Sequence, residues 1–256
     1  MTEYQTIKLV DDGDVVSLIL NRPPLNVMNI AMMQEMNTAL ASLRSHPRLK
    51  VLVIQAEGKA FSAGVDVAEH TADKVDGMMR EFHYLFNLLH GLKCATVAAV
   101  DGAALGGGCE VALFCDMVVA SERAKFGQPE IKVGVFPPIA AAVVPRLIGR
   151  GRALEFLMSG DNMSAVEAER LGLINRVFPV ENFQQHVQDF VKRLSGHSKI
   201  ILEMTKQAVD DGLTRARMSA VDHATDFYMN EMMKTEDAHE GLDAFLQKRQ
   251  PVWKNQ

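Results

Sequence analysis

Apolar and polar residues alternate near the start of the chain, in the segment TIKLVDDGDVVSLILNRP (residues 6–23). Two β-rich runs flank the turn-forming pair Asp12-Gly13, and Pro23 ends the second run, so the pattern predicts a β-hairpin. From Ile30 to Leu43 apolar residues recur every three or four positions, which predicts an amphipathic helix. Its apolar stripe is rich in methionine, and we interpret it as a core-facing stripe rather than an adaptable binding surface.

The middle of the chain alternates short apolar runs with segments of helical periodicity. KVLVIQAEG and ATVAAV are predicted to be buried strands, MVVAS a shorter strand, and FSAGVD a loop. Helices are predicted from Lys74 to Leu92 and from about Gly108, with later helical pieces ending at Gly149 and Gly160. Strands that alternate with helices in this way predict an α/β fold.

The last part of the chain changes character after about Val180, where helical periodicity continues without strand signals. Helices are predicted over residues 183–194, 198–212, 217–234 and 237–247. We place an α/β core at residues 1–195 and a helical region at residues 196–256. The helical region is too small to bury a core of its own, so we expect it to pack on the core or on a neighbouring subunit.

Composition narrows the class of protein. The 256 residues are 48% hydrophobic and 23% charged, and the net charge is −5, which argues against a nucleic-acid partner. The three cysteines suit neither a disulfide framework nor a zinc site, and we expect reduced thiols in a cytoplasmic protein. We expect no membrane span, because no run of about 20 apolar residues occurs. His83 and His90 share one predicted helix, but further metal ligands are missing, so no metal site is predicted.

The segment DGAALGGGCEVALFCD (residues 101–116) concentrates glycines at the end of a predicted strand. Its spacing fits neither the P-loop pattern nor the dinucleotide-binding pattern, so a nucleotide loop is not expected. Two interpretations stay open. Its N–H groups at a helix N-terminus could serve an anionic or developing oxygen, or the glycines could allow close packing of strand on helix.

Two glutamates with apolar neighbours follow this turn. Glu110 lies in the first turn of the predicted helix, and Glu130 follows Pro129 ahead of a β-like run. Glu110 could simply be a solvated or capping residue, because a carboxylate is favoured at a helix N-terminus. Alternatively, burial would raise the pKa of each group and make the two a general acid/base pair. Spacing alone does not decide between these interpretations.

Several motifs together resemble the enoyl-CoA hydratase/isomerase (crotonase) superfamily. They are KAFSAGVD (residues 59–66), AAVDGAALGGGCEVALFCDMVVAS (98–121), AKFGQPEIKVGVFPP (124–138), and the longer segments at 145–179 and 240–255. The resemblance covers essentially the whole chain. It implies a spiral of β-β-α turns followed by a helical trimerisation region. It also implies an acyl-CoA thioester substrate, a homo-trimer or a hexamer built as a dimer of trimers, and no cofactor beyond the CoA of the substrate.

The resemblance also implies roles for individual residues. The N–H groups of Val65 and Gly107 would hold the thioester oxygen, Glu110 would help deprotonate a water, and Glu130 would protonate the α carbon. Ser62 lies in the same loop without a base partner, and we interpret it as a structural polar residue. For Lys248 a solvated helix-face lysine is an equally weighted alternative to a CoA contact. The implied CoA contacts are Ala63, Asp66, Val67, Ala68, Phe245 and Lys248.

One segment departs from the common hydratase pattern, in which small residues follow the second glutamate. Here VGVFPPIAAA places Phe136, Pro138 and Ile139 where glycines are usual, so we expect Phe136 and Ile139 to reshape the acyl pocket. With NRPPLNVMNIAMM (residues 21–33), this segment is similar to the cyclic-dienoyl-CoA hydratases of anaerobic aromatic degradation. The alternatives are an enoyl-CoA isomerase with one working glutamate, or a non-catalytic scaffold or RNA-binding paralogue of the same fold.

Overall fold

Two β-sheets organise the protein, whose computed structural model describes residues 4–71, 73–214, 225, 227, 228 and 230–256. The larger sheet has the order β1-β2-β3-β5-β7-β10, antiparallel between β1 and β2 and parallel elsewhere. Its strands are β1 (Ile7–Asp11), β2 (Val15–Leu20), β3 (Val51–Ala56), β5 (Ala95–Val100), β7 (Met117–Ser121) and β10 (Arg176–Phe178). The predicted hairpin and the predicted strands in the middle of the chain are therefore confirmed.

The smaller sheet has the order β4-β6-β8-β9 and carries the segments around the candidate site. Its strands are β4 (Ala60–Ser62), β6 (Ala103–Leu105), β8 (Lys125–Gly127) and β9 (Asn162–Ser164). The expectation of a loop throughout residues 61–66 was wrong for its first two residues, because buried β4 pairs in parallel with β6. Strands of three residues carry too little periodicity to be recognised from sequence.

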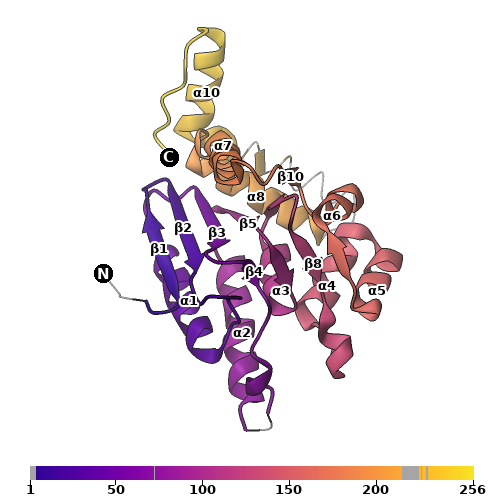
Figure 1. The fold of residues 1–256 in the computed structure, drawn as a ribbon. Coiled ribbons are helices and arrows are strands. Elements are labelled where there is room, and N and C mark those ends of the chain that lie inside the picture. Colours follow the sequence, from indigo (N-terminus) through magenta and orange to yellow (C-terminus); the bar gives the residue numbers. More distant parts are fainter. Residues whose placement is uncertain (1–3, 72, 215–224, 226, 229) are drawn as a thin grey trace.

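Helices cover both faces of the larger sheet (Figure 1). Successive strand residues point to opposite faces, so Leu52 and Ile54 join the main core while Val51 and Val53 face the other way. Helices α1 (Ile30–Leu43) and α2 (Val75–His90) pack against each other on the main-core side. Helix α7 (Phe183–Ser195) covers the opposite face with Phe183, Val187 and Val191. The helices predicted over residues 30–43 and 74–92 are therefore confirmed as α1 and α2.

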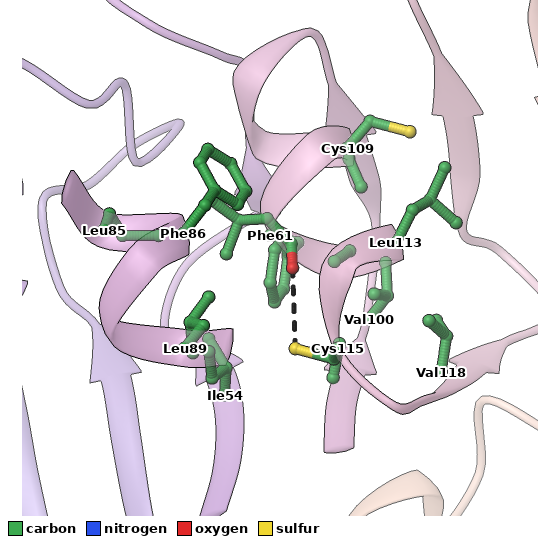
Figure 2. Close-up of a cluster of buried hydrophobic side chains, with 14 of the residues drawn as sticks. Ile54, Phe61, Leu85, Phe86, Leu89, Val100, Cys109, Leu113, Cys115 and Val118 are labelled. Atoms are coloured by element: carbon green, nitrogen blue, oxygen red, sulfur yellow. Dashed lines mark hydrogen bonds between the residues drawn. The ribbon is translucent and has the colours of Figure 1, made fainter. Parts of the chain in front are cut away.

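The main core continues between α2 and helix α3 (Gly107–Phe114). Figure 2 shows Phe61 among side chains from several elements, including Leu85, Phe86, Val100 and Cys115. The Cys115 thiol donates a long hydrogen bond of 3.5 Å to the carbonyl oxygen of Val111. All three cysteines are buried and none is paired with another.

Several shorter helices occur along the chain between β4 and α7. They are η1 (Val67–Glu69), η2 (Pro129–Val133), α4 (Pro138–Ile148), α5 (Arg150–Ser159) and α6 (Ala165–Leu171). Helices α4 and α5 end at Gly149 and Gly160, as predicted. The β-like run expected after Glu130 was wrong: η2 is a 3-10 helix with Pro129 in its first turn. Proline fixes φ near the helical value and supplies no N–H for a strand ladder.

The C-terminal region comprises α8 (Lys199–Leu213), η3 (Met232–Lys234) and α10 (Glu236–Leu246). Lys206 ties α8 to the core through a 2.8 Å ion pair with Asp116. The end of the chain folds back on α10, where buried Asp237 accepts hydrogen bonds from the N–H groups of Lys254 and Asn255. Most of the helix predicted over residues 217–234 lies outside the described residues. The division at residue 195 stays a prediction.

We expect Phe61→Ala to destabilise the protein by about 3–5 kcal/mol, because it removes a large, fully buried ring and leaves a cavity. The midpoint of denaturant unfolding at fixed protein concentration measures this loss. Tyr84→Ala, which truncates a half-exposed ring on α2, is the control and should change the free energy of unfolding by less than about 1 kcal/mol. Equal losses in both variants would contradict the placement of Phe61.

Candidate functional site

The glycine-rich turn joins β6 to α3 and contacts a different partner at each of its three glycines. An added Cβ at Gly106 would lie 2.7 Å from Oε1 of Glu130, and one at Gly107 would lie 2.6 Å from Cγ2 of Val65. A Cβ at Gly108 would lie 2.5 Å from Cβ of Ser62. Gly106 also has a φ of +51°, a conformation that glycine adopts without strain. Close packing is therefore one reason for this sequence.

The same turn leaves main-chain donors available. Gly107 is the first residue of α3, where N–H groups have no intrahelical acceptor. Val65 lies in the neighbouring loop, and a Cβ added at Gly64 would be 3.6 Å from the Gly107 nitrogen. Among the hydrogen bonds within the described part of the chain, none uses the N–H of Val65 or of Gly107. The packing interpretation and the donor interpretation are thus compatible.

Glu110 lies in the first turn of α3, and its side chain reaches the start of α4. The N–H groups of Ile139 and Ala140 each donate to Oε1 of Glu110 over 2.8 Å. Only 3% of Glu110 is exposed, and this burial raises the pKa of its carboxyl to about 7. The two N–H donors oppose the rise, while the negative charge of Glu130 adds to it. The group therefore titrates near neutral pH.

Glu130 is half-buried in η2, and burial raises the pKa of its carboxyl as well. Gln128 lies beside it and is fully buried. With its amide nitrogen facing Glu130, Gln128 lies 3.1 Å from Oε2 and 3.3 Å from Oε1 of the carboxylate. The structure thus brings together the two glutamates that the sequence singled out, both with raised pKa values, beside the donors of Val65 and Gly107.

The loop expected to contact CoA lies next to these donors. Asp66 caps η1 by accepting a 3.1 Å hydrogen bond from the N–H of Ala68. The Val67 side chain is 67% exposed, and Ala63 is partly buried. Val67 and Ala68, at the end of this loop, are therefore accessible to a ligand.

The two expected CoA contacts near the C-terminus do not meet this loop within one chain. Phe245 lies in α10, which packs against α8 and η3, and the structure describes its backbone only. Lys248 follows the helix and is exposed. Figure 1 shows α10 at the opposite end of the molecule from the start of α2, into which the loop leads.

The two residues expected in the acyl pocket differ in burial. Ile139 is partly buried and packs against the main core, and its N–H is one of the donors to Glu110. Phe136 is 69% exposed in the single chain, within an exposed apolar segment that also includes Ile131, Val133 and Val135.

Three features of the site were missed in the sequence. Gln128 stands in the quoted GQPE motif, which could have pointed to it. The Ile139 and Ala140 donors and the buried Asn26 beside the Val65 loop gave no sequence signal. Two cavities lie elsewhere, and both have Lys93 and Glu203 in their lining. The smaller, of about 240 Å³, is beside the end of α1, and the larger, of about 640 Å³, is beside the end of α2 and α8.

Two absences hold for the described residues. They contain no cluster of three or more His, Cys, Asp or Glu side chains that could bind a metal ion. No helix among them has the length and apolar character needed to cross a membrane.

We expect Glu110→Gln to gain stability relative to the wild type as pH rises. In the wild type the pKa of Glu110 is about 7 in the folded state and exceeds the ordinary 4.5. The contribution of this group to the free energy of unfolding is therefore fully present below about pH 4.5 and is lost as the pH rises to about 7. The glutamine variant lacks this titration. Its relative gain should reach at most about 3 kcal/mol.

Denaturant unfolding at pH 4, 6 and 8 measures this gain. Glu122→Gln, on the surface, is the control for replacing an exposed glutamate. Parallel pH dependences for the wild type and Glu110→Gln would show that Glu110 has no raised pKa.

Comparison with known proteins agrees with this geometry. The sequence model of the family "Enoyl-CoA hydratase/isomerase" matches residues 11–256. A protein of Mycobacterium bovis named as a probable enoyl-CoA hydratase is 36% identical over 252 residues, covering 97% of each chain. The cyclohexa-1,5-dienecarbonyl-CoA hydratase of Thauera aromatica is 35% identical over 246 residues, covering 95% of this chain and 94% of that protein.

Solved structures give the same result for the fold. The crystal structure of an enoyl-CoA hydratase from Bacillus anthracis superposes with a TM-score of 0.93 at 29% identity, covering 98% of this chain and 100% of that one. An enoyl-CoA hydratase subunit from Geobacillus kaustophilus superposes with a TM-score of 0.91 at 34% identity, with both chains fully covered. The predicted crotonase-like α/β fold is confirmed. The chain belongs to the enoyl-CoA hydratase/isomerase family.

Proposed function

We propose that this protein is a hydratase that adds water reversibly to the conjugated double bond of an enoyl-CoA thioester. The observation that carries the proposal is the pair of buried Glu110 and half-buried Glu130, whose carboxyl groups both have raised pKa values and lie beside a turn with unused N–H donors. The names of its relatives support the same reaction. A non-catalytic scaffold would have no need to bury Glu110 fully and Glu130 partly at this cost in free energy.

In the proposed reaction the N–H groups of Val65 and Gly107 hold the thioester oxygen. Addition of water to the β carbon moves electron density onto this oxygen as an enolate-like state forms. Donors fixed in place before the reaction stabilise that charge by a few kcal/mol each, roughly. Because main chain supplies both donors, the Val65 side chain does not obstruct this role.

Glu110 and Glu130 divide the proton transfers. A water molecule lies between the two carboxyl groups. Glu110 takes a proton from this water, and the oxygen of the water forms the new bond to the β carbon. Glu130, which starts as the carboxylic acid, then gives its proton to the α carbon, so that H and OH are added across the double bond. Return of the proton from Glu110 to Glu130 restores both groups for the next turnover. Dehydration runs in the reverse order. Since Oε1 of Glu110 is held by the N–H groups of Ile139 and Ala140, its Oε2 is the atom left for the water.

CoA is proposed to lie along Ala63 and the segment Asp66–Ala68. Within one chain Phe245 and Lys248 are remote from this segment, so we propose that they reach CoA from a neighbouring subunit of a homo-trimer, alone or within a hexamer. A lysine near the CoA phosphates is favoured by charge.

For the acyl group we propose a cyclic dienoyl-CoA. The support is the rigid Pro137-Pro138 pair with Phe136 and Ile139 after Glu130, together with the similarity to the Thauera aromatica enzyme. Residues of this kind leave less freedom for a straight chain than the glycines usual in the family. A flat ring has fewer conformations than a straight acyl chain, so it needs less conformational freedom in the pocket.

We expect hydration of crotonyl-CoA or a cyclic dienoyl-CoA in ¹⁸O-labelled water to place the label in the product. Glu110→Gln and Glu130→Gln should each lower the rate by roughly 10²–10⁴-fold, because each removes one proton-transfer group. Mass spectrometry detects the label, and Glu122→Gln is the surface control. A shifted double bond without label would support the isomerase alternative. Unchanged turnover in Glu130→Gln would contradict the mechanism.

A substrate panel tests the acyl group. We expect cyclohexa-1,5-diene-1-carbonyl-CoA to be hydrated with a higher kcat/KM than crotonyl-CoA. Phe136→Ala should shift the ratio toward crotonyl-CoA by about tenfold, the effect of losing apolar contact with one substrate. Val133→Ala, equally exposed in the same segment, is the control and should leave the ratio unchanged. Rapid hydration of crotonyl-CoA with none of the ring substrate would overturn this assignment.

A further inference from the structure

A short N-terminal segment runs beside the loop that carries the Val65 donor. We name residues 22–30 the strap and residues 62–69 the donor loop. The N–H of Ala63 donates to the carbonyl oxygen of Leu25 over 2.9 Å, and the Ser62 hydroxyl donates to the carbonyl oxygen of Asn26 over 2.7 Å. At the far end, Oε2 of Glu69 accepts from the N–H of Ile30 over 2.6 Å. The strap therefore holds the donor loop along its whole length.

The centre of this contact is a parallel bridge between Met28 and Val65. The N–H of Met28 donates to the carbonyl oxygen of Gly64 over 2.8 Å, and the N–H of Asp66 donates to the carbonyl oxygen of Met28 over 2.9 Å. The Gly64 carbonyl and the Val65 N–H belong to one planar peptide unit, in which they point in opposite directions. The Met28–Gly64 hydrogen bond therefore turns the Val65 N–H away from the strap.

Asn26 fixes the course of the strap. It is fully buried and has a φ of +49°, in the left-handed region that asparagine tolerates better than most residues. Its Nδ2 donates to the carbonyl oxygens of Glu57 and Ala60 over 2.7 and 2.9 Å, and its Oδ1 accepts from the N–H of Arg22 over 2.8 Å. One side chain thus joins the strap to the chain segment that leads into the donor loop.

We infer that Asn26 is a positioning residue for the reaction: through the strap it sets the direction in which the Val65 N–H meets the thioester oxygen. The inference rests on the proposed function and adds to it a buried residue that does not touch the substrate. A donor must lie within about 2.7–3.1 Å of the developing oxyanion to stabilise it. A small rotation of the Gly64–Val65 peptide unit is enough to lose that distance.

The test is Asn26→Gly, which tolerates the same backbone conformation and removes the three side-chain hydrogen bonds. We expect kcat for enoyl-CoA hydration to fall by roughly 10–100-fold, with a smaller change in KM, because misplacing one such donor costs mainly transition-state stabilisation. The second readout is the absorption spectrum of bound cinnamoyl-CoA. Hydrogen bonds to its conjugated carbonyl shift the spectrum to longer wavelength, and the shift should shrink in the variant.

Asn37→Ala is the matched control. Asn37 is also buried, but it lies in α1 and its side chain donates to Glu81, away from the strap. This variant should lose stability while keeping wild-type kcat and the wild-type spectral shift. Ser62→Ala provides a milder variant if Asn26→Gly does not fold. It removes the hydroxyl that donates to the carbonyl oxygen of Asn26 and also accepts from the N–H of Gly64 over 3.2 Å, so it loosens the donor loop on both sides of this link. It should lower kcat and the spectral shift in the same direction.

The outcomes separate this inference from the proposed function. Wild-type kcat and spectral shift in a folded Asn26→Gly, or in Ser62→Ala where Asn26→Gly does not fold, would overturn the inference alone. Equal losses in Asn37→Ala would do the same, since they would mark a general effect of stability. A wild-type protein that neither hydrates enoyl-CoA thioesters nor shifts the spectrum would overturn the proposed function and the inference with it.

Discussion

The carboxylate of Glu110, held at the N-terminus of α4, is the interaction on which the arrangement of the site depends. A carboxyl group this deeply buried requires donors, and the N–H groups of Ile139 and Ala140 supply them. The contact fixes the start of α4 against α3. It thereby also sets the point at which the segment between Glu130 and Pro138, which includes Phe136, joins α4. The same burial brings the pKa of Glu110 to about 7, where both protonation states are accessible.

The glycines give the site its second constraint. Each of Gly106, Gly107 and Gly108 contacts a different element, so no side chain can be added without displacing Glu130, Val65 or Ser62. Absence of side chains allows the donor loop, η2 and α3 to meet at one point. The packing that explains the glycines and the donors proposed for the thioester are therefore two consequences of one geometry.

Local patterns in the sequence were sufficient for much of the fold. Regular alternation predicted the hairpin, helical spacing predicted α1 and α2, and Gly149 and Gly160 marked helix ends. The three-residue strands could not be recognised, because each exists through pairing with a segment distant in sequence. The run after Glu130 was wrongly expected to be β-like, since Pro129 begins a 3-10 helix there.

Some residues of the candidate site could likewise be predicted from the sequence, and others could not. Glu110 and Glu130 were identifiable by their apolar neighbours and by the family motifs, and the structure brings them together. Their surroundings were not predictable, because the donors to Glu110 are main-chain groups about 30 residues away. Asn26 could not be predicted for the same reason, because the acceptors of its side-chain amide are main-chain carbonyl oxygens, which have no sequence signature.

The most direct test of the central claim is a crystal structure of the protein with butyryl-CoA, a saturated thioester that cannot be hydrated. We expect the thioester oxygen within about 3 Å of the main-chain nitrogens of both Val65 and Gly107. The α carbon should face Glu130, and the β carbon should lie on the side of Glu110. A thioester oxygen that contacts neither nitrogen, or an acyl group bound away from both glutamates, would contradict the account.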